Sequence, residues 1–369
     1  MLLIKLKIVI GFYQVTYGLL QTFSYINWPG SLQAIAKYSG ILQMDVLQVA
    51  PIHCLFPGLK VDAFGSLFAL MSLNSFVIGF SFVAYGIRKV IILRDQNTDD
   101  TEKLRNISET KEFLYRNVFF FLYVTYLSTS SKTVNVLPLN CRTLCRDEKE
   151  EFCNNFMRAD YSIQCQGTQY NHLLIGTYFS ATYVVALPVI SFVAIWKQQR
   201  LATADAETLR DSGCGKETIT GLRFLFENYN PRSWYWEFVE MSRKVILTSG
   251  LILVGQESRS YIGLAWVIAG MYGMLFAWIK PIQDSTDNRL MTISLAVTVV
   301  NLGVGAVSRI PAEQIKPSSI DPYTDAILFR ILILGANSLV IGLLVGKMVL
   351  ELLSEHVLLS QSVIQSLDW

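Results

Sequence analysis

Residues 63–93 read AFGSLFALMSLNSFVIGFSFVAYGIRKVIIL, an apolar run without a charged residue before Arg88. About 20 such residues are enough to cross the hydrocarbon core of a bilayer as a helix. A helix on the surface of a soluble domain keeps a polar face toward water, and this stretch has none. The stretch therefore predicts a membrane-spanning helix.

Seven further segments repeat this pattern, so the chain is predicted to be an all-α, polytopic membrane helix bundle of about eight transmembrane helices, a single transmembrane domain over residues 1–369. Composition agrees, because 52% hydrophobic and 16% charged residues with a mean hydropathy of +0.38 are unusual for a soluble protein. The predicted spans are Leu2–Ile26, Ala63–Leu93, Leu114–Leu137, His172–Trp196, Trp236–Gly255, Tyr261–Ile279, Leu290–Ser308 and Ala326–Leu350.

The first of these segments is too long for a cleavable signal peptide and lacks a small-residue cleavage site. We expect it to act as a signal anchor that stays in the membrane. The abrupt start at Met1 also fits a piece of a longer protein.

Four cysteines fall in the connector 138–171, between the third and fourth spans. Their spacing matches no zinc pattern and no histidine lies among them, which favours two disulfides and therefore an extracellular loop. Four cysteines allow three pairings, and we favour one bridge nested inside the other, although Cys54 could compete and a reduced loop is the alternative. The favoured pairs are Cys145–Cys153 inside Cys141–Cys165.

Basic residues support the same orientation. With the cysteine loop outside, twenty of the thirty-one Lys and Arg residues fall on the cytosolic side, as the positive-inside rule expects. Both termini are then cytosolic and the plasma membrane is the expected location. The sequon Asn106-Ile107-Ser108 falls inside in this arrangement, so we predict that Asn106 carries no glycan.

The connector 197–235 is predicted to form a cytosolic elbow that leads into the fifth span. Its apolar residues share one face of a helix, which suits an amphipathic helix in the inner interface. A surface helix packed on its own loops is the alternative. The residues of that face are Ile219, Leu222, Leu225, Phe226 and Tyr229.

Charged residues inside spans are candidates for function, because hydrocarbon disfavours them. The start of the fifth span carries such a cluster: Glu237, Glu240, Arg243 and Lys244. Glu240 reaches both basic residues at helical spacing, so the cluster could act as a gate latch or ion relay, or only position the helix. For the functional reading we expect Glu240→Gln to leave folding intact and to alter gating.

Single polar residues in other spans are weaker candidates. Arg330 could line a pathway, but so near a span end it is more readily explained by snorkelling to the interface. Amides at Asn74, Asn301 and Asn337 need partners inside the membrane, either on a neighbouring helix or in a polar cavity. Small-residue faces at 342–346 and at Ala269 with Gly273 permit a homodimer.

Other classes of function find no support in the sequence. The three histidines are scattered and form no metal set, and there is no nucleophile–base spacing or phosphate-binding loop, so we expect no enzyme, cofactor or metal. A net charge of +2 gives no argument for a nucleic acid. Membrane lipid is the partner that the composition implies.

Several stretches resemble a known family. They are KIVIGFYQV (residues 7–15), ADYSIQC (159–165), LFENY (225–229) followed by WYWE (234–237), and KPI (280–282). Together they resemble the membrane domain at the C-terminal end of large multidomain proteins of invertebrates and protists, which is similar to the TRP-like (TRP C-terminal) membrane family. This resemblance covers nearly the whole chain and implies a channel- or transporter-like protein linked to calcium or lipid handling. It supplies no catalytic residue, and it ranks the charged start of the fifth span first among functional candidates.

Two functions remain open at this stage. The first is a channel or transporter subunit that moves ions, calcium among them, or lipid. The alternative is a cell-surface receptor or adhesion-type signal transducer, in which the cysteine loop and the connector 27–62 form an outer ligand platform. The permeant species or ligand, the stimulus and the oligomeric state are not encoded in any motif.

Overall fold

The structure is a computed structural model that is mostly helical and forms two compact units. One unit contains residues 1–39 and 257–369, and the other contains residues 40–256. The described residues are 2–24, 26, 28–35, 62–94, 99–145, 153–203, 222–254, 259–308 and, near the C-terminus, 327, 330, 331, 333–343, 345, 346 and 349. Cys54 and Ile219, named in the sequence analysis, lie outside them.

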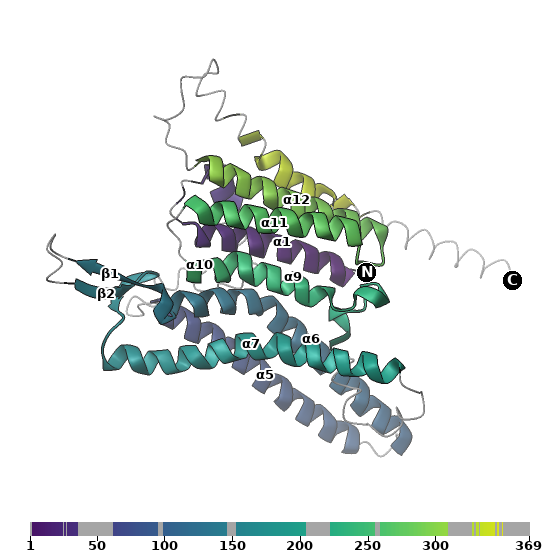
Figure 1. The fold of residues 1–369 in the computed structure, drawn as a ribbon. Helices are drawn as coiled ribbons and strands as arrows, with labels where there is room; N and C mark the ends of the chain where they lie inside the picture. The colour runs from purple at the N-terminus through teal and green to yellow at the C-terminus, as the bar shows by residue number, and fades with distance from the viewer. Residues whose placement is uncertain are drawn as a thin grey trace. The chain divides into compact units, whose positions relative to one another are not determined.

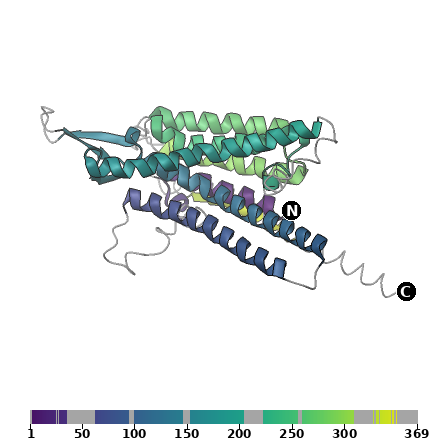
Figure 2. The same cartoon turned by 90° about the horizontal axis from the view of Figure 1, so that it is seen from below.

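Three long helices dominate the unit of residues 40–256: α5 (Ala63–Arg94), α6 (Asp100–Val136) and α7 (Thr168–Thr203). Helices α5 and α6 run side by side as an antiparallel pair, and α7 packs against α6 (Figures 1 and 2). Beyond Asn74, no residue of α5 is buried, and most of its apolar side chains from Phe76 to Leu93 are exposed.

The fifth predicted span is built from three consecutive pieces, α9 (Trp236–Val245), the π-helix η5 (Ile246–Gly250) and α10 (Leu251–Val254). Its contacts with α6 advance in the same direction along both helices: Glu237 lies beside Tyr123, and Ser249 lies beside Ser130. The two therefore run parallel. A π-helix was not foreseen from the sequence, where the segment reads as a plain apolar helix.

A small antiparallel sheet joins α6 to α7 where the sequence predicted only a loop. After the short 3-10 turn η1 (Pro138–Asn140), the strands are β1 (Cys141–Cys145), β2 (Cys153–Met157) and β3 (Asp160–Gln164), in the order β1-β2-β3. Met157 of this sheet is fully buried in one apolar cluster with Phe64, Val136 and Tyr170. The sheet therefore sits at the end of the unit where α5 begins, α6 ends and α7 begins.

The unit of residues 1–39 and 257–369 contains α1 (Leu2–Thr22), α11 (Arg259–Ile279) and α12 (Ser285–Ser308). Helices α11 and α12 form a hairpin that Asn288 braces, because its amide nitrogen donates to the Ile282 carbonyl and its amide oxygen accepts from the Ile282 N–H. The described residues between 327 and 349 are helical, and Phe12, Val297 and Val340 join them to α1 and α12.

Four of the predicted spans are confirmed as helices of sufficient length and apolarity to cross a membrane. Among the described residues these are Ala63–Arg94, Tyr170–Lys197, Tyr261–Ile279 and Ser285–Val307. The third predicted span is part of a longer helix that begins at Asp100 rather than Leu114.

The described part of the elbow, residues 222–235, departs from the expected continuous helix. It consists of two short 3-10 turns, η3 (Arg223–Leu225) and η4 (Pro231–Ser233), separated by turns. Leu222, Phe224 and Leu225 are buried against α6 and α7 rather than facing an interface. Pro231 has no N–H to continue a helix, which explains why the chain restarts there.

Candidate functional site

The four charged residues predicted at the start of the fifth span are all buried. Glu237, Glu240, Arg243 and Lys244 lie within ten residues of α9 and expose 1%, 3%, 6% and 8% of their surface. Isolated charges would not remain buried, because the desolvation cost is several kcal/mol for each. Their partners therefore decide what the cluster is.

Glu240 is the anion of a buried ion triad. The Arg243 guanidinium donates from Nη2 to Glu240 Oε1 at 2.6 Å and from Nε to Oε2 at 3.0 Å, a two-point contact. The ammonium of Lys244 lies 3.5 Å from Oε1 of the same carboxylate. Spacings of three and four residues place both cations on the helix face of Glu240, as the sequence predicted.

Glu237 is held from two other elements. The hydroxyl of Tyr123, on α6, donates to its Oε1, and the hydroxyl of Tyr229, on the elbow, donates to its Oε2 at 2.7 Å. Lys244 donates to the Tyr123 oxygen at 3.4 Å and lies over its ring. Tyr123 thus connects Glu237 to the ion triad, and one network joins α6, the elbow and α9.

Directly after this network the helix changes its hydrogen-bond pattern. The Thr248 hydroxyl, in η5, donates to the Lys244 carbonyl at 2.7 Å, and the Ser249 hydroxyl accepts from Ser130 of α6 at 3.2 Å. Single π-helical turns inside α-helices often occur at functional sites. In such a turn the backbone hydrogen bonds span five residues instead of four. The charged network is therefore followed by a locally altered stretch of the same span.

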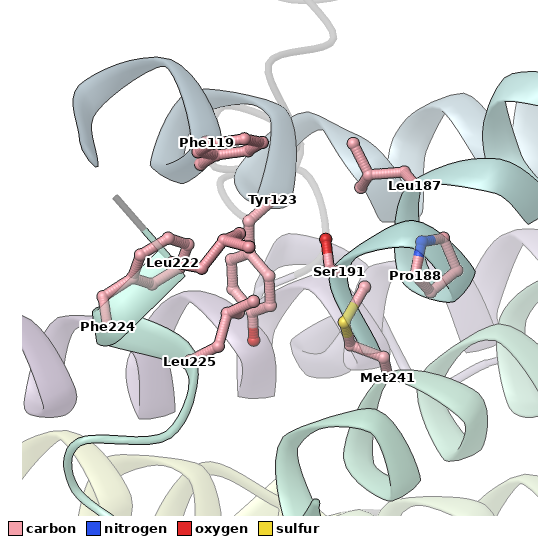
Figure 3. A pocket seen from close by; sticks show the side chains of 9 residues that line it. All are labelled: Phe119, Tyr123, Leu187, Pro188, Ser191, Leu222, Phe224, Leu225 and Met241. Atoms are coloured by element: carbon pink, nitrogen blue, oxygen red, sulfur yellow. The ribbon is translucent and has the colours of Figure 1, made fainter. Parts of the chain in front are cut away.

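A small apolar cavity lies beside Tyr123, with a volume of about 10 Å³. Figure 3 shows Tyr123 and Phe119 on one side of it and Pro188 and Ser191 of α7 on another. Such a volume is about the minimum for one water molecule. Its lining is completed by Leu187, Leu222, Phe224, Leu225 and Met241, so the elbow, α6, α7 and α9 all meet at an imperfectly filled point.

The predicted intramembrane amides fall in different places. Asn301 of α12 and Asn337 form a reciprocal pair, with donor–acceptor distances of 3.2 and 3.1 Å. This is the helix-contact role that the sequence allowed. Asn74 is buried in α5, and neither its amide nitrogen nor its amide oxygen has a hydrogen-bond partner among the described residues. Arg330 is exposed, and its role stays a prediction.

The small-residue faces also differ. Ala269 is buried, and the position of a Cβ on Gly273 lies 3.9 Å from Leu295 of α12. That face is used inside its own unit. At Gly342 and Gly346 no described atom lies within 4 Å of an added Cβ.

The four connector cysteines form two disulfides, Cys141–Cys165 and Cys145–Cys153, which is the nested pairing favoured from the sequence. The first packs against the apolar cluster at the sheet, with Cys141 Sγ 3.6 Å from the Tyr170 hydroxyl. The second joins directly paired residues of β1 and β2 on an exposed hairpin. Within the described part of the chain, no three His, Cys, Asp or Glu side chains are placed to hold a metal ion.

Sequence reasoning missed several buried polar residues. Lys5, Lys7 and Gln14 lie in α1 and expose little surface, and two charges within a predicted span were the signal that could have found them. Tyr123 and Tyr229 could not be found this way. Tyr123 is 114 residues from Glu237 in the sequence, and Tyr229 is separated from it by the turn η4.

Comparison with known proteins gives limited information. No family model matches the chain, and no solved structure matches it. A curated protein of Toxoplasma gondii, "Cysteine repeat modular protein A", is 24% identical over 209 residues, which cover 52% of this chain. The chain spans about 6% of the length of that relative.

Proposed function

We propose that this chain is a multi-pass membrane protein that serves as a TRP-like channel or transporter subunit, moving ions, calcium among the candidates, or lipid. The observation that carries the proposal is the buried network of Glu237, Glu240, Arg243, Lys244 and Tyr123. A network of this kind inside apolar helices is expensive to maintain, and intramembrane charges that face the protein interior commonly mark ion pathways and their gates.

Helix directions support the eight alternating spans of this proposal. Within the unit of residues 40–256, α5 and α7 run parallel to each other and antiparallel to α6, while α9 runs parallel to α6. In the other unit, contacts from Phe12 to Val297 and from Trp28 to Gly305 make α1 parallel to α12. Odd- and even-numbered spans alternate in just this way if each crosses the bilayer once; the placement of both termini in the cytosol and of the sheet outside rests on the disulfides and the basic residues of the connectors.

The network also provides a route from the cytosolic elbow to the helices. A shift of the elbow would withdraw the Tyr229 hydroxyl from Glu237, and Tyr123 would then hold Glu237 without its second donor. The π-helix η5 and the small cavity beside Pro188 are places where α9 and α7 could move without breaking close packing. We place the gate at this point.

Glu237→Gln is the variant that tests the gate. Glutamine keeps an acceptor for one tyrosine but removes the charge, so gating should shift about fivefold or more in open probability, as couplings of 1–3 kcal/mol produce. Ion flux and single-channel currents in reconstituted liposomes measure it under stretch, voltage and calcium steps. Glu227→Gln, an exposed elbow residue 3.3 Å from Arg223, is the matched control. Unaltered currents in a well-folded Glu237→Gln protein would contradict the proposed gate.

Glu240 is a poorer test than its position in the sequence suggested. It is the anion for two buried cations, and removing one partner of a buried ion pair costs about 3–5 kcal/mol. We therefore expect Glu240→Gln to lower the yield of folded protein, which revises the expectation that folding stays intact.

A receptor or adhesion-type transducer is the second candidate, and the disulfide-bonded sheet favours it. Strands β1 and β3 expose most of their residues, as a surface that binds an outer ligand would. Two results together would support this candidate over the first. They are the absence of ion flux in liposomes under stretch, voltage and calcium steps, and saturable binding of a ligand to the outside of intact cells that express the protein.

A further inference from the structure

A groove lies between α5 and α6 at the end of this helix pair opposite the sheet (Figure 1). Its volume is about 550 Å³, far larger than that of the cavity beside Tyr123. Its lining consists of Arg88 and Ile92 on α5 and of Asn106, Glu109, Thr110 and Phe113 on α6. The groove therefore brings a cation and an anion together at one place, with an amide beside them.

Helical spacing explains why these residues share the groove. Arg88 and Ile92 are four residues apart on α5, and on α6 the same spacing separates Asn106 from Thr110. Residues four apart lie on one face of a helix, so each helix turns one face to the groove. Because the two helices are antiparallel, Arg88 lies toward the Thr110 side of the groove and Ile92 toward the Asn106 side.

The polar groups of the groove are free to bind a ligand. Arg88 and the Asn106 amide have no ion pair or hydrogen bond within the described part of the chain. Glu109 lies 3.7 Å from Arg105, and both side chains are about two-thirds exposed, at 68% and 67%. An exposed pair of this kind contributes little, so the Glu109 carboxylate keeps oxygen lone pairs for another donor. The Thr110 hydroxyl is already used, since it donates to the Asn106 carbonyl at 2.7 Å.

The groove lies at the depth of lipid headgroups if α5 crosses the bilayer as proposed. Arg88 follows 25 residues after Ala63, the first residue of α5, which is about 38 Å along a helix. The hydrocarbon core is about 30 Å thick, and the bilayer with its headgroups about 40–45 Å. With Ala63 at the outer edge of the core, Arg88 falls just beyond the inner edge, and a tilt of about 20° brings it closer to that edge.

Apolar side chains continue from the groove toward the membrane. Phe113, in the lining, exposes 57% of its surface, and on α5 the neighbouring residues Phe80, Val83 and Ile87 expose 65%, 60% and 58%. Such surfaces suit acyl chains. A ligand with a charged head and an apolar tail therefore matches both parts of this region.

The two charges in the lining select the headgroup. A guanidinium such as that of Arg88 binds phosphate oxygens well, whereas the carboxylate of Glu109 repels a second negative charge. An ammonium group carries three donors and can bond to Glu109 and to the Asn106 amide oxygen. A headgroup with a phosphate and a primary ammonium satisfies both charges, and a choline headgroup does not, because its nitrogen has no N–H.

We propose that this groove binds a zwitterionic phospholipid of the inner leaflet, phosphatidylethanolamine. Arg88 donates to its phosphate, the Glu109 carboxylate and the Asn106 amide oxygen accept from its ammonium group, and Phe113 contacts its acyl chains. Bound in this way, the lipid bridges α5 and α6. The proposal goes beyond transport and takes from the proposed function only the crossing of α5.

Thermal unfolding of the full chain in detergent micelles tests binding without any requirement for transport. Phosphatidylethanolamine should raise Tm in a saturable way, at about fivefold lower concentration than phosphatidylcholine or phosphatidylglycerol with the same acyl chains, as an exposed ion pair allows. Arg88→Gln should raise the half-saturating concentration of all three lipids. Glu109→Gln should raise it about fivefold for phosphatidylethanolamine alone. Lys89→Gln and Glu112→Gln, matched changes at exposed residues outside the lining, should change none of these values.

Equal half-saturating concentrations of the three lipids for the wild-type chain would overturn the proposal. A preference for phosphatidylglycerol would overturn it in favour of a simple anion site, and a Glu109→Gln protein that still prefers phosphatidylethanolamine would overturn the selected headgroup. Glycerophosphoethanolamine has the same headgroup without acyl chains, so an equal effect of this soluble compound would exclude a lipid as the source. Silence in the liposome flux assay would count against the channel and not against this site, because lipid binding is measured in the absence of flux.

Discussion

At the scale of single residues, tyrosine 123 shows how a neutral group can organise buried charge. Its hydroxyl donates to Glu237 and accepts from Lys244, so it separates an anion from a cation while bonding to both. A hydroxyl can do this because it carries one donor and two acceptor lone pairs. Phenylalanine at this position would leave Glu237 with one of its two tyrosine donors.

Gly176 is a residue for which tertiary packing excludes any side chain. A Cβ there would meet the ring of Phe68 on α5, so we expect Gly176→Ala to destabilise the protein by about 1–3 kcal/mol through overpacking. Gly79→Ala and Gly86→Ala, where nothing lies within 4 Å, should be neutral or slightly stabilising. Thermal unfolding in nanodiscs measures the three variants side by side; equal midpoints would contradict the close approach of α5 and α7.

Asp99 makes the start of α6 sensitive to pH. The Thr101 hydroxyl and the Asp100 N–H donate to its carboxylate, and these bonds lower the pKa of Asp99 from the ordinary value of 3.8. A lowered pKa stabilises the folded helix start fully above that ordinary value, and the contribution is lost as the pH falls through the lower, folded-state pKa.

The expected outcome is faster amide exchange in residues 100–103 only below about pH 4. Hydrogen exchange measured by mass spectrometry checks it, with Asp99→Asn as the control, because asparagine caps a helix without titrating. A wild-type protein and an Asp99→Asn variant with the same pH dependence would rule out this role for the carboxylate.

At the scale of elements, the fifth span shows why its composition is unusual. Its first ten residues carry four charges on α9, and the following nine residues, in η5 and α10, carry none. The charged part contacts the Tyr123 hydroxyl of α6 through Glu237, and the uncharged part contacts the Ser130 hydroxyl of α6 through Ser249. Each half of the span is therefore hydrogen-bonded to α6.

The two disulfides should differ in importance for the sheet. Cys141–Cys165 closes a separation of 24 residues and packs against the buried cluster, whereas Cys145–Cys153 closes only 8 residues at an exposed hairpin. Loop-closure entropy alone predicts about 3.4 and about 2.5 kcal/mol, respectively, and the lost packing adds to the first.

We therefore expect the double variant Cys141→Ser with Cys165→Ser to yield little monodisperse protein, while Cys145→Ser with Cys153→Ser matures with a moderately lower Tm. Size-exclusion profiles of protein from the same expression host, followed by thermal unfolding, compare the two. Equal yields and equal midpoints would mean that the bridge at the cluster is dispensable.

At the scale of the whole molecule, the proposed crossing pattern places the sheet outside and residue 106 inside. In intact cells, a membrane-impermeant maleimide should label the sheet cysteines only after a mild reductant, and Asn106→Gln should not change the mobility of the protein on a gel. The physical reason is that disulfides persist on the oxidising side of the membrane. Labelling that requires permeabilisation, or a glycosidase-sensitive glycan on Asn106, would invert the arrangement.

The sequence by itself determined where the long apolar helices lie, because length and hydropathy act locally: α5, α7, α11 and α12 fall where the segments 63–93, 172–196, 261–279 and 290–308 predicted them. It also indicated the charged face of α9, since spacings of three and four residues meet on any helix. Tertiary structure alone decided that Asn301 meets Asn337, that Asn74 meets no such amide in the described part of the chain, and that Tyr123 and Tyr229 converge on Glu237. Those outcomes depend on which helices become neighbours and in what register. Hydrophobicity along one chain carries no information about that, because many apolar faces are equally hydrophobic and only their detailed shapes, as at Gly176 and Phe68, select a neighbour.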